Sequence, residues 1–582
     1  VTRRAGDAAT IEAEMQGGSF GSGAGSVTAS NRLGSFDGLF SGSYRKSDGW
    51  RPLEYAQELS LFGKLGWRNE RTDAWLSYTF EADSLEGPGP LPESWIKGGP
   101  LPPDIVSPPP DRRRLQYTGG VGDAVRPRLH FINGKAEHEL ADSWKIQASG
   151  FGRFADFRQS NDNISEPDAL GLTNIASYGS TIQLLHERRD ALLFSAGAEW
   201  SRNNVDIEIR KRPNRNFPAI LETTTERLRT DEDNYGTFGE VWWGLSPRVS
   251  LYSSVRFDYV KLPVEDLMDP SDSGENTFSE VSGGLGLTTD FGAGLGGFLS
   301  YGRGFRAPVI IEVTCSDPAD PCQLPFELGP DPELKPVKSD SWEAGFRVTK
   351  ERLQGSVITY WSEVRDDIFN VIDEATPTLG YFTNLDRTRR VGVEVSAAAL
   401  LFSEVPGLSV TGSLGVTRAT FQTHAELASP LVDDDDEEEE EGATLAGLPE
   451  DDEGGAVEVE PGDIFPMIPF FTGTVGLQYE TGPTLFAVET DWTSKQFLVG
   501  NESNEEPFQM LPARLVLDVR AEHTIGQATL FAEISNFLDS DYSAFGIISE
   551  NGRGATERVE RFLTPGLPRR ITAGIRVRFG GG

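Results

Sequence analysis

The stretch Arg570-Ile571-Thr572-Ala573-Gly574-Ile575-Arg576-Val577-Arg578-Phe579 alternates between apolar residues and residues that are polar or small. Because successive side chains of a β-strand point to opposite faces, one face of this strand is apolar throughout and the other carries its arginines. A soluble sheet would bury the apolar face against a second layer, whereas a membrane barrel would turn it to lipid and keep the arginines in a wet lumen. The rest of the chain decides between the two.

The same alternation recurs in about 22 segments, from Thr10–Gln16 to the quoted stretch, and charged residues such as Asp518 and Arg520 stand in mid-strand. Short connections rich in turn residues alternate with long ones. The short connections are Asn69–Asp73, Ala141–Ser143, Ser246–Arg248, Thr481–Pro483 and Ile525–Gln527. The long connections are Glu81–Arg128, Phe157–Tyr178, Lys211–Asp231, Gly304–Asp340, Thr423–Phe465 and Ser540–Pro568. The sequence therefore predicts an all-β fold, a transmembrane antiparallel β-barrel of about 22 strands that forms a single domain over residues 1–582. It has short periplasmic turns and long extracellular loops.

Composition agrees with a barrel and excludes other classes of protein. Hydrophobic residues make up 37 % of the 582 residues, which is low for a soluble chain of this length that must bury a large core. Nothing approaches the roughly 18 apolar residues that a transmembrane helix needs. The net charge of −37 argues against nucleic acid as a partner. The motifs of serine hydrolases and zinc proteases are absent from the sequence, so we do not expect an enzyme.

Several motifs resemble those of TonB-dependent outer-membrane receptors, in the order that this family has them. They are Val1-Thr2-Arg3-Arg4, Phe305-Arg306-Ala307-Pro308, Asp331-Pro332-Glu333-Leu334-Lys335-Pro336, Val391-Gly392-Val393-Glu394 after Asn384, Asn536-Phe537-Leu538-Asp539 with Tyr542, and the terminal aromatic Phe579. The first is similar to the end of the family's plug domain, so residues 1–8 are expected to be the junction with a plug. The plug itself is missing from this sequence, and either the same longer chain or a separate polypeptide would supply it. The chain departs from the family in ending with Gly580–Gly582 after the aromatic residue.

The resemblance implies active transport across the outer membrane of a Gram-negative-type bacterium. The expected ligand is a scarce nutrient, foremost a ferric siderophore or a similar small-molecule metal chelate, captured by the extracellular loops. The expected partners are outer-membrane lipid, the plug and a TonB-type energy-coupling complex that acts through the plug. Haem ranks low, because Val309–Pro330 contains none of the five histidines. A non-energised channel and a surface adhesion or structural barrel remain alternatives.

Seven residues at strand tops and loop walls are candidate ligand contacts, because arginines pair with carboxylate, phosphate or catecholate oxygens and aromatic rings stack on planar ligands. They are Tyr44, Trp50, Arg51, Arg303, Arg306, Tyr381 and Arg387. For Arg306 a structural ion pair is the stronger alternative.

Two further features lie in the long loops. Cys315 and Cys322 form an isolated pair, which predicts a small loop disulfide rather than a metal site, since no histidine lies nearby. Asp433–Glu441 is an acidic run within the loop 423–465. A solvated loop explains it better than a calcium site, which needs defined ligand spacing. No metal site and no cofactor are expected.

Overall fold

The computed structural model describes residues 8–580 except 104, 118–122, 163–166, 189–191, 271–272, 317–321, 324–333, 373–378, 403–406, 429–455, 506–509 and 554–558. The barrel strands are β1 (Thr10–Gly18), β2 (Gly23–Leu33), β3 (Phe36–Ser47), β4 (Ala56–Arg68), β5 (Thr72–Gly87), β7 (Asp123–Ala141), β8 (Trp144–Asn161), β9 (Asp168–Arg188), β10 (Leu192–Arg212), β11 (Thr223–Ser246), β12 (Val249–Asp266), β13 (Gly274–Gly292), β14 (Leu295–Arg306), β16 (Val337–Lys350), β17 (Leu353–Ile372), β18 (Leu379–Leu400), β19 (Leu408–Phe421), β22 (Phe471–Thr481), β23 (Thr484–Thr493), β24 (Arg514–Ile525), β25 (Ala528–Ser535) and β28 (Arg570–Phe579).

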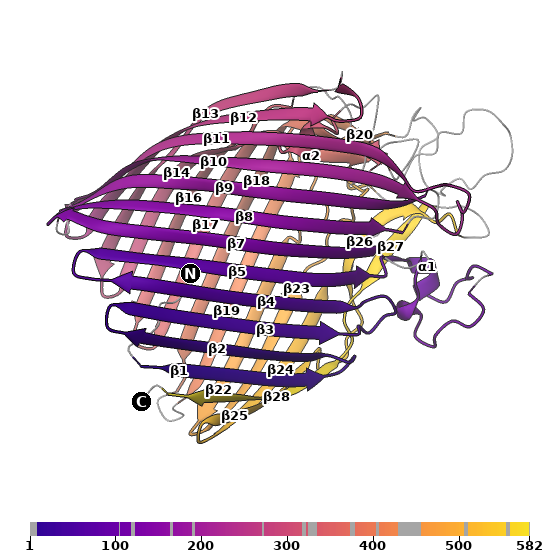
Figure 1. Cartoon of the computed structure of the whole chain (residues 1–582). Coiled ribbons are helices and arrows are strands. Elements are labelled where there is room, and N and C mark those ends of the chain that lie inside the picture. The colour runs from indigo at the N-terminus through magenta and orange to yellow at the C-terminus, as the bar shows by residue number, and fades with distance from the viewer. Residues whose placement is uncertain are drawn as a thin grey trace.

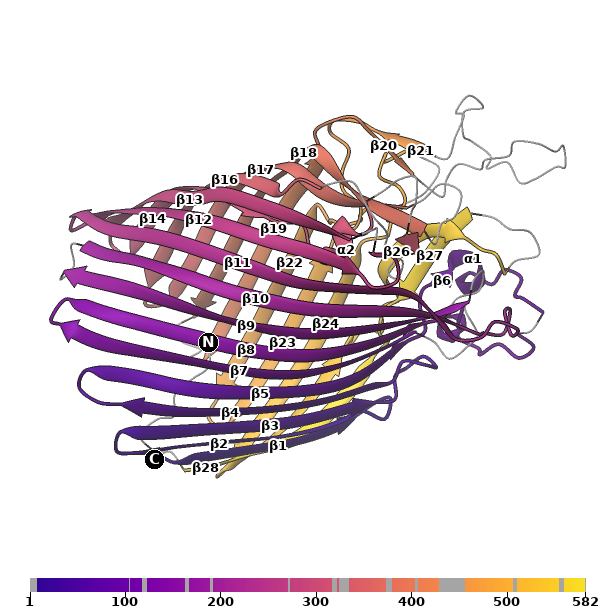
Figure 2. The same cartoon turned by 45° about the horizontal axis from the view of Figure 1, so that its top comes forward.

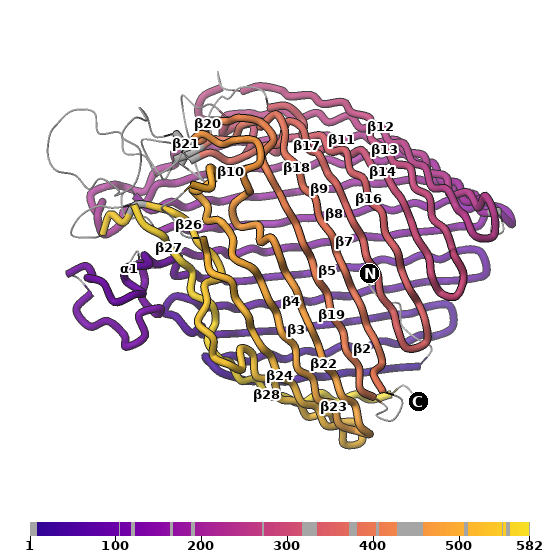
Figure 3. The backbone as a smooth tube through the Cα atoms, turned by 180° about the vertical axis from the view of Figure 1, so that it is seen from behind, coloured from indigo at the N-terminus to yellow at the C-terminus, as the bar shows by residue number. Residues whose placement is uncertain are grey.

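These strands form one closed antiparallel barrel. Each pairs with the next in chain order, and β1 also pairs with β28, which closes the ring. The two-residue strand β15 (Cys322–Gln323) adds to β18 and makes this sheet 23-stranded, so 22 strands form the wall itself. The predicted fold class and strand number are confirmed. β1 begins and β28 ends at the end with short hairpins, and the long connections gather at the opposite end (Figures 1 and 3).

The alternation of apolar and polar residues in the sequence corresponds to the outer and inner faces of the wall. On β28, Ile571 and Ile575 are 52 % and 39 % exposed on the outer face, whereas Arg576 points inward and pairs with Glu14 of β1 at 2.7 Å. Further round the barrel, Arg520 forms an ion pair with Glu522 at 2.5 Å, also inside. The wall therefore has an apolar outer face and a charged, self-pairing inner face, as the sequence indicates.

Two of the long connections are shorter than the sequence suggests. Most of Phe157–Tyr178 and Lys211–Asp231 belongs to β8, β9, β10 and β11, and β11 alone is 24 residues long. At about 3.3 Å per residue this strand runs for about 79 Å, far beyond the roughly 30 Å of a bilayer core. Beyond the apolar band the ladder continues because it still pairs backbone N–H and C=O groups, although the side chains have become polar. Strand lengths predicted from membrane thickness are therefore too short for β8, β9, β10 and β11.

The end with long connections, which we call the mouth, has secondary structure of its own. A small sheet joins β6 (Leu91–Pro92), β27 (Val559–Pro565) and β26 (Ser543–Glu550), and a second pairs β20 (Ala425–Ala428) with β21 (Ala456–Val459). The helices are short: α1 (Glu93–Ile96), the 3-10 turn η1 (Arg112–Arg114) and α2 (Ile310–Val313). Figure 2 shows these elements clustered over one end of the barrel. None of the helices among the described residues is long and apolar enough to span a membrane.

Buried apolar residues gather at the mouth in three clusters. The largest includes Phe421, Leu498, Leu511 and Ile548, the second lies around Leu262 and Val313, and the third around Trp95. The first unites segments that are far apart in the sequence. Residues 1–7 of the predicted plug junction and residues 429–455 of the acidic loop lie outside the described residues.

Candidate functional site

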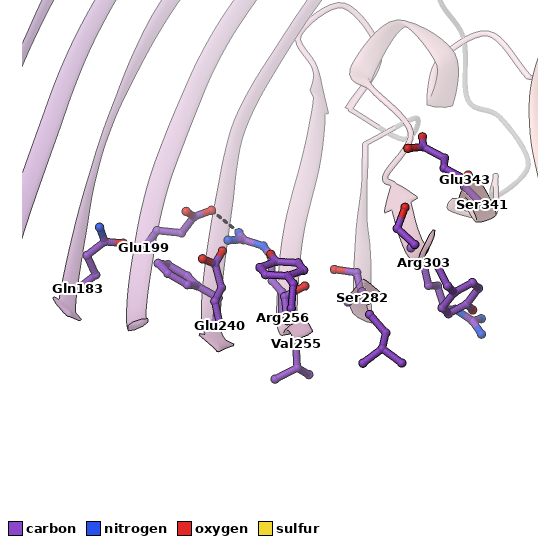
Figure 4. Close-up of a pocket in the computed structure, with 18 of the residues that line it drawn as sticks. Gln183, Glu199, Glu240, Val255, Arg256, Ser282, Arg303, Ser341 and Glu343 are labelled. Atoms are coloured by element: carbon purple, nitrogen blue, oxygen red, sulfur yellow. Dashed lines mark hydrogen bonds and ion pairs between the residues drawn. The ribbon is translucent and has the colours of Figure 1, made fainter. Parts of the chain in front are cut away.

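The inner wall carries a hollow of about 650 Å³ across β9 to β16. Its polar side chains come from alternate positions of neighbouring strands, because only every second residue faces the lumen. In Figure 4, Gln183, Glu199, Glu240 and Glu343 point to one side of the wall and Val255 points to the other. The wall is thin here, since Gly283 and Gly302 lie among the lining residues and have no side chains.

Acidic groups dominate this hollow. Arg256 forms ion pairs with both Glu199 and Asp258, and its guanidinium lies 6.0 Å from the centre of the Phe238 ring. Glu240 and Glu343 also line the space. Such a surface can hold water, cations or the basic groups of another polypeptide in the lumen.

A second hollow of about 420 Å³ lies on the inner face of β1 to β5. Glu14, Glu58, Glu81 and Asp83 line it together with Arg45, which pairs with Glu58 at 3.4 Å. The two hollows share one character, so the lumen is an acid-rich passage with isolated arginines.

Above the lumen, α2 holds Arg306 in place at the mouth. Arg306 Nη1 donates to Glu312 Oε2 at 2.6 Å, and the backbone N–H of Val309 donates to the same oxygen at 2.9 Å. The Phe382 N–H donates to the Cys315 carbonyl at 2.6 Å and so ties α2 to β18. Tyr381 stands next to this contact and packs against the largest apolar cluster. The structure thus brings Arg306 and the Tyr381 segment together around α2.

Cys315 is fully buried and takes part in a disulfide. The only other cysteine of the chain is Cys322, whose side chain lies outside the described residues, so its pairing with Cys315 stays a prediction.

Trp50 and Arg51 are each only 3 % exposed. Arg51 donates to the carbonyl oxygens of Gly89 at 2.9 Å and Leu115 at 3.0 Å, which ties the first long hairpin to the loop after β5. Burial lowers the pKa of the Arg51 guanidinium to about 10. Both side chains are packed within the loops and offer little surface to a ligand.

Three other predicted contacts stand on the outer face of their strands. Tyr44 shares the outer face of β3 with Phe36 and Phe40, and its residue borders the second hollow. Arg303 follows Leu299 and Tyr301 on the outer face of β14 and borders the first hollow, where the wall is thin. Arg387 pairs at 3.3 Å with Glu363 on the outer face of β17. The structure therefore does not gather the seven predicted residues into one site.

The lumen residues Glu199, Glu240 and Arg256 are absent from the predicted set. Their signal is present in the sequence, because each is a charged residue inside a strand whose other face is apolar. Predicting that they meet requires the register of β10, β11 and β12, in which Glu199 lies opposite Gly236 and Arg256 opposite Phe238.

A model of the TonB-dependent receptor-like β-barrel matches residues 27–537, most of the chain. The chain belongs to the TonB-dependent receptor family. Proteins of this family are transport receptors of Gram-negative outer membranes. Among the described residues of this TonB-dependent receptor, no group of three or more His, Cys, Asp or Glu side chains could hold a metal ion.

Solved structures of several receptors have the same fold as this TonB-dependent receptor. The unliganded ferric citrate transporter FecA superposes with a TM-score of 0.75 at 13 % identity, over 100 % of this chain and 80 % of its own. The ferric yersiniabactin uptake receptor FyuA from Yersinia pestis superposes with a TM-score of 0.72 at 13 % identity, over 100 % of this chain and 81 % of its own. The siderophore receptor PiuA from Acinetobacter baumannii superposes with a TM-score of 0.71 at 12 % identity, over 99 % of this chain and 82 % of its own.

Proposed function

We propose that this chain is the barrel of an outer-membrane receptor that binds a ferric siderophore or a similar metal chelate at its mouth. The chelate then passes through the lumen with energy from a TonB-type complex. The observation that carries this proposal is a polar lumen in a 22-stranded wall, with folded, apolar-packed loops in the described part of the mouth. A constitutive pore has no need of such a packed mouth, whereas a receptor needs one to hold a ligand.

The solved receptors of similar fold support a ferric chelate as the class of ligand. FecA, FyuA and PiuA are described as a ferric citrate transporter, a ferric yersiniabactin receptor and a siderophore receptor. Ferric chelates present carboxylate, hydroxamate or catecholate oxygens, which guanidinium groups bind well. These likenesses at 12–13 % identity show the fold, so the chelate remains our proposal.

Within the mouth, Arg306 and Tyr381 are the proposed ligand contacts. The Arg306 side chain is 46 % exposed although it pairs with Glu312, so an anionic ligand can reach it and exchange with that carboxylate. Tyr381 would stack on a planar chelating group from the neighbouring strand. The outward-facing or buried positions of the other five predicted contacts leave them out of this site.

The proposal also requires partners and an arrangement of the chain. A plug, from the same longer chain or from a separate polypeptide, would occupy the acid-rich lumen, and the coupling complex would act through it. Residues 1–8 would be the junction with the plug, and residues 423–465 an extracellular acidic loop of the single barrel domain. The site would bind its ligand without a cofactor and without catalysis.

The test is a binding titration of the purified chain with ferric citrate and with a ferric catecholate, read by quenching of tryptophan fluorescence. We expect saturable binding that weakens about tenfold in R306Q and stays unchanged in R227Q, whose arginine lies on the outer wall. Failure of every ferric chelate to bind, together with a large steady conductance in planar bilayers that a plug leaves unchanged, would replace this proposal with a constitutive channel.

A further inference from the structure

The outer face of the wall carries a group of arginines just beyond an aromatic row. In the register of β14 to β19, Tyr301 lies opposite Trp342, Trp342 opposite Trp361, and Trp361 opposite Val391. Arg418 continues this row on β19. Five guanidinium groups, which we call the arginine collar, lie in this row or in the next rows toward the mouth: Arg303, Arg365, Arg387, Arg389 and Arg418.

Contacts show that the collar faces outward. Trp342 and Trp361 are 54 % and 48 % exposed on the apolar side of the wall. The Tyr301 and Trp342 rings are 4.6 Å apart, and the Arg389 guanidinium lies 4.9 Å from the Trp361 ring. Aromatic residues of membrane barrels mark the boundary between hydrocarbon and headgroups. The collar therefore lies at headgroup level or slightly above it, since two residues of strand rise about 7 Å.

Only two outward carboxylates among the described residues form ion pairs with the five guanidinium groups. Glu363 is shared between Arg387 at 3.3 Å and Arg389 at 3.5 Å, and Asp340 pairs with Arg365 at 3.3 Å. Within the described part of the chain, neither Arg303 nor Arg418 forms an ion pair, and both are exposed. The nearby Lys338 pairs with Glu280, so we leave it out of the collar. Among the described residues of this sector, guanidinium groups therefore outnumber the carboxylates that pair with them.

Two collar residues also face each other directly. Arg365 and Arg387 are opposite partners across β17 and β18. Like charges in this position destabilise a sheet unless an anion lies between them. Their side chains are 50 % and 46 % exposed, so such an anion can approach from outside the wall.

The corresponding sector of β10 to β12 is different. There Arg202 pairs with Asp233 at 2.8 Å, Arg229 with Asp206 at 3.2 Å, and Lys261 with Glu275 at 2.8 Å. Arg227 also approaches Asp206, at 3.9 Å, and Arg229 reaches a second carboxylate, Glu265, at the same distance. This sector therefore has as many carboxylates as cations among these pairs. In a chain with a net charge of −37, an excess of arginines in one outward sector is a local exception.

We propose that the arginine collar binds the phosphate groups of an anionic, phosphate-bearing lipid of the outer leaflet. Guanidinium groups bind phosphate oxygens through paired N–H donors, and the aromatic row beneath would pack against the acyl chains of the same lipid. The opposed arginines and the unpaired Arg303 and Arg418 supply the charge, and the aromatic row sets the depth. A soluble chelate at the mouth would not use this surface, so the site is separate from the proposed transport site.

The test compares lipid binding by the whole chain and by two double variants. The probe is diphosphorylated lipid A in detergent micelles, with fully dephosphorylated lipid A as its counterpart, and bound lipid is counted by native mass spectrometry. R303Q/R418Q removes two arginines that form no ion pair, so the wall should keep its stability. R229Q/K261Q removes the same charge from the balanced sector.

We expect a clear preference of the unaltered chain for the phosphorylated lipid, because each surface arginine contributes about 1 kcal/mol near anionic lipid. R303Q/R418Q should bind it at least tenfold more weakly, and R229Q/K261Q should bind it as the unaltered chain does. Equal weakening in both variants would show non-specific attraction and overturn the proposal. So would the absence of a preference for phosphate, or displacement of the lipid by equimolar inorganic phosphate, which would indicate a site for the free anion. If R303Q/R418Q does not fold, the single variant R418Q gives the same comparison with a smaller expected loss.

Discussion

The middle of the barrel and its mouth are stable for different reasons. At mid-barrel the large apolar side chains, such as Val255, Phe346 and Ile571, face outward and are 52–59 % exposed, while the inner face is polar. At the mouth, Phe421 and Phe465 stack with ring centres 4.2 Å apart inside a cluster whose members come from distant loops. The wall therefore depends on its hydrogen-bond ladder and on lipid, and the mouth on ordinary hydrophobic packing. We expect the mouth to open as a local unit while the wall stays closed.

The largest effect should come from removing a buried ring of the mouth. Phe421 is 1 % exposed, so Phe421→Ala should lower the stability of the mouth by about 3–5 kcal/mol through lost burial and a cavity. Hydrogen exchange of the segment around Phe465 should accelerate, and the melting temperature of the barrel should stay the same. Phe346→Ala, on the outer face, is the matched control. A fall of the barrel melting temperature in Phe421→Ala would show that mouth and wall unfold together.

Breaking the ion pair between Glu93 and Arg561 should have the next largest effect. Their side chains are 19 % and 10 % exposed and join the loop after β5 to the last loop. Glu93→Ala removes the charged hydrogen bonds between this carboxylate and the buried Arg561 guanidinium, at a cost of about 3 kcal/mol to the mouth. Lys97 is the other ion-pair partner of Glu93, and its side chain is 66 % exposed. Lys97→Ala should therefore cost the mouth below about 1 kcal/mol. The measurement is hydrogen exchange of the loop around Glu93. Equal exchange rates in Glu93→Ala and Lys97→Ala would contradict the idea that burial makes the Glu93–Arg561 pair the stronger one.

The stability of the mouth should also depend on pH through Glu502. This side chain is 6 % exposed, and burial raises its pKa to about 7, although the Gly500 N–H donates to it at 3.0 Å. The folded state therefore keeps a proton that the unfolded state loses above about pH 4.5. Stability should be highest below that pH and fall by about 3 kcal/mol as the pH rises through 7.

Glu502→Gln removes this titration, so hydrogen exchange of the segment from Gln496 to Glu505, corrected for intrinsic rates, should no longer change between pH 5 and pH 8. The exposed Glu480→Gln should keep the pH dependence of the unaltered chain. A pH dependence that survives in Glu502→Gln would assign it to another group.

The smallest effect should come from an ion pair in the lumen. Arg520 is 35 % exposed and pairs with both Glu522 and Glu533, so Glu522→Gln leaves it one carboxylate and the lumen water. We expect a loss below about 1 kcal/mol in the thermal unfolding of the barrel. Glu489→Gln on the neighbouring strand is the control, since within the described residues Glu489 forms no ion pair. A loss as large as that of Glu93→Ala would mean that water screens ion pairs in the lumen no better than it does in the mouth.

The wall can be predicted from the sequence because its signal is local. Alternation along Arg570–Phe579 reports which residues face outward without knowledge of any partner strand, and the same holds for all the barrel strands. The signal fades where strands leave the apolar band, which is why the sequence predicts a loop where the upper part of β11 lies. The mouth cannot be predicted in this way, because contacts such as that of Ser94 with Glu560 join residues at opposite ends of the chain.

The candidate site shows the same limit. Arginine and tryptophan serve packing as well as binding, so residue type alone does not separate Arg51, which bonds loop carbonyls, from Arg306, which stays accessible. Arg303 is different, because it has the same parity as Leu299 and Tyr301 on β14. The alternation along this one strand is therefore enough to place Arg303 on the outer face.

The unequal strand lengths have a consequence for which part of the rim can open. The wall is tall along β11, with 24 residues, and low along β25, with 8 residues, which correspond to about 79 Å and about 26 Å of strand. On the low side, β26 and β27 follow β25 and carry Ile548 and Leu563 of the largest apolar cluster. One side of the rim is thus a continuous hydrogen-bond ladder and the other is packed loops. Local opening of the loops would therefore create an asymmetric gate on the low side while the tall side stays in place.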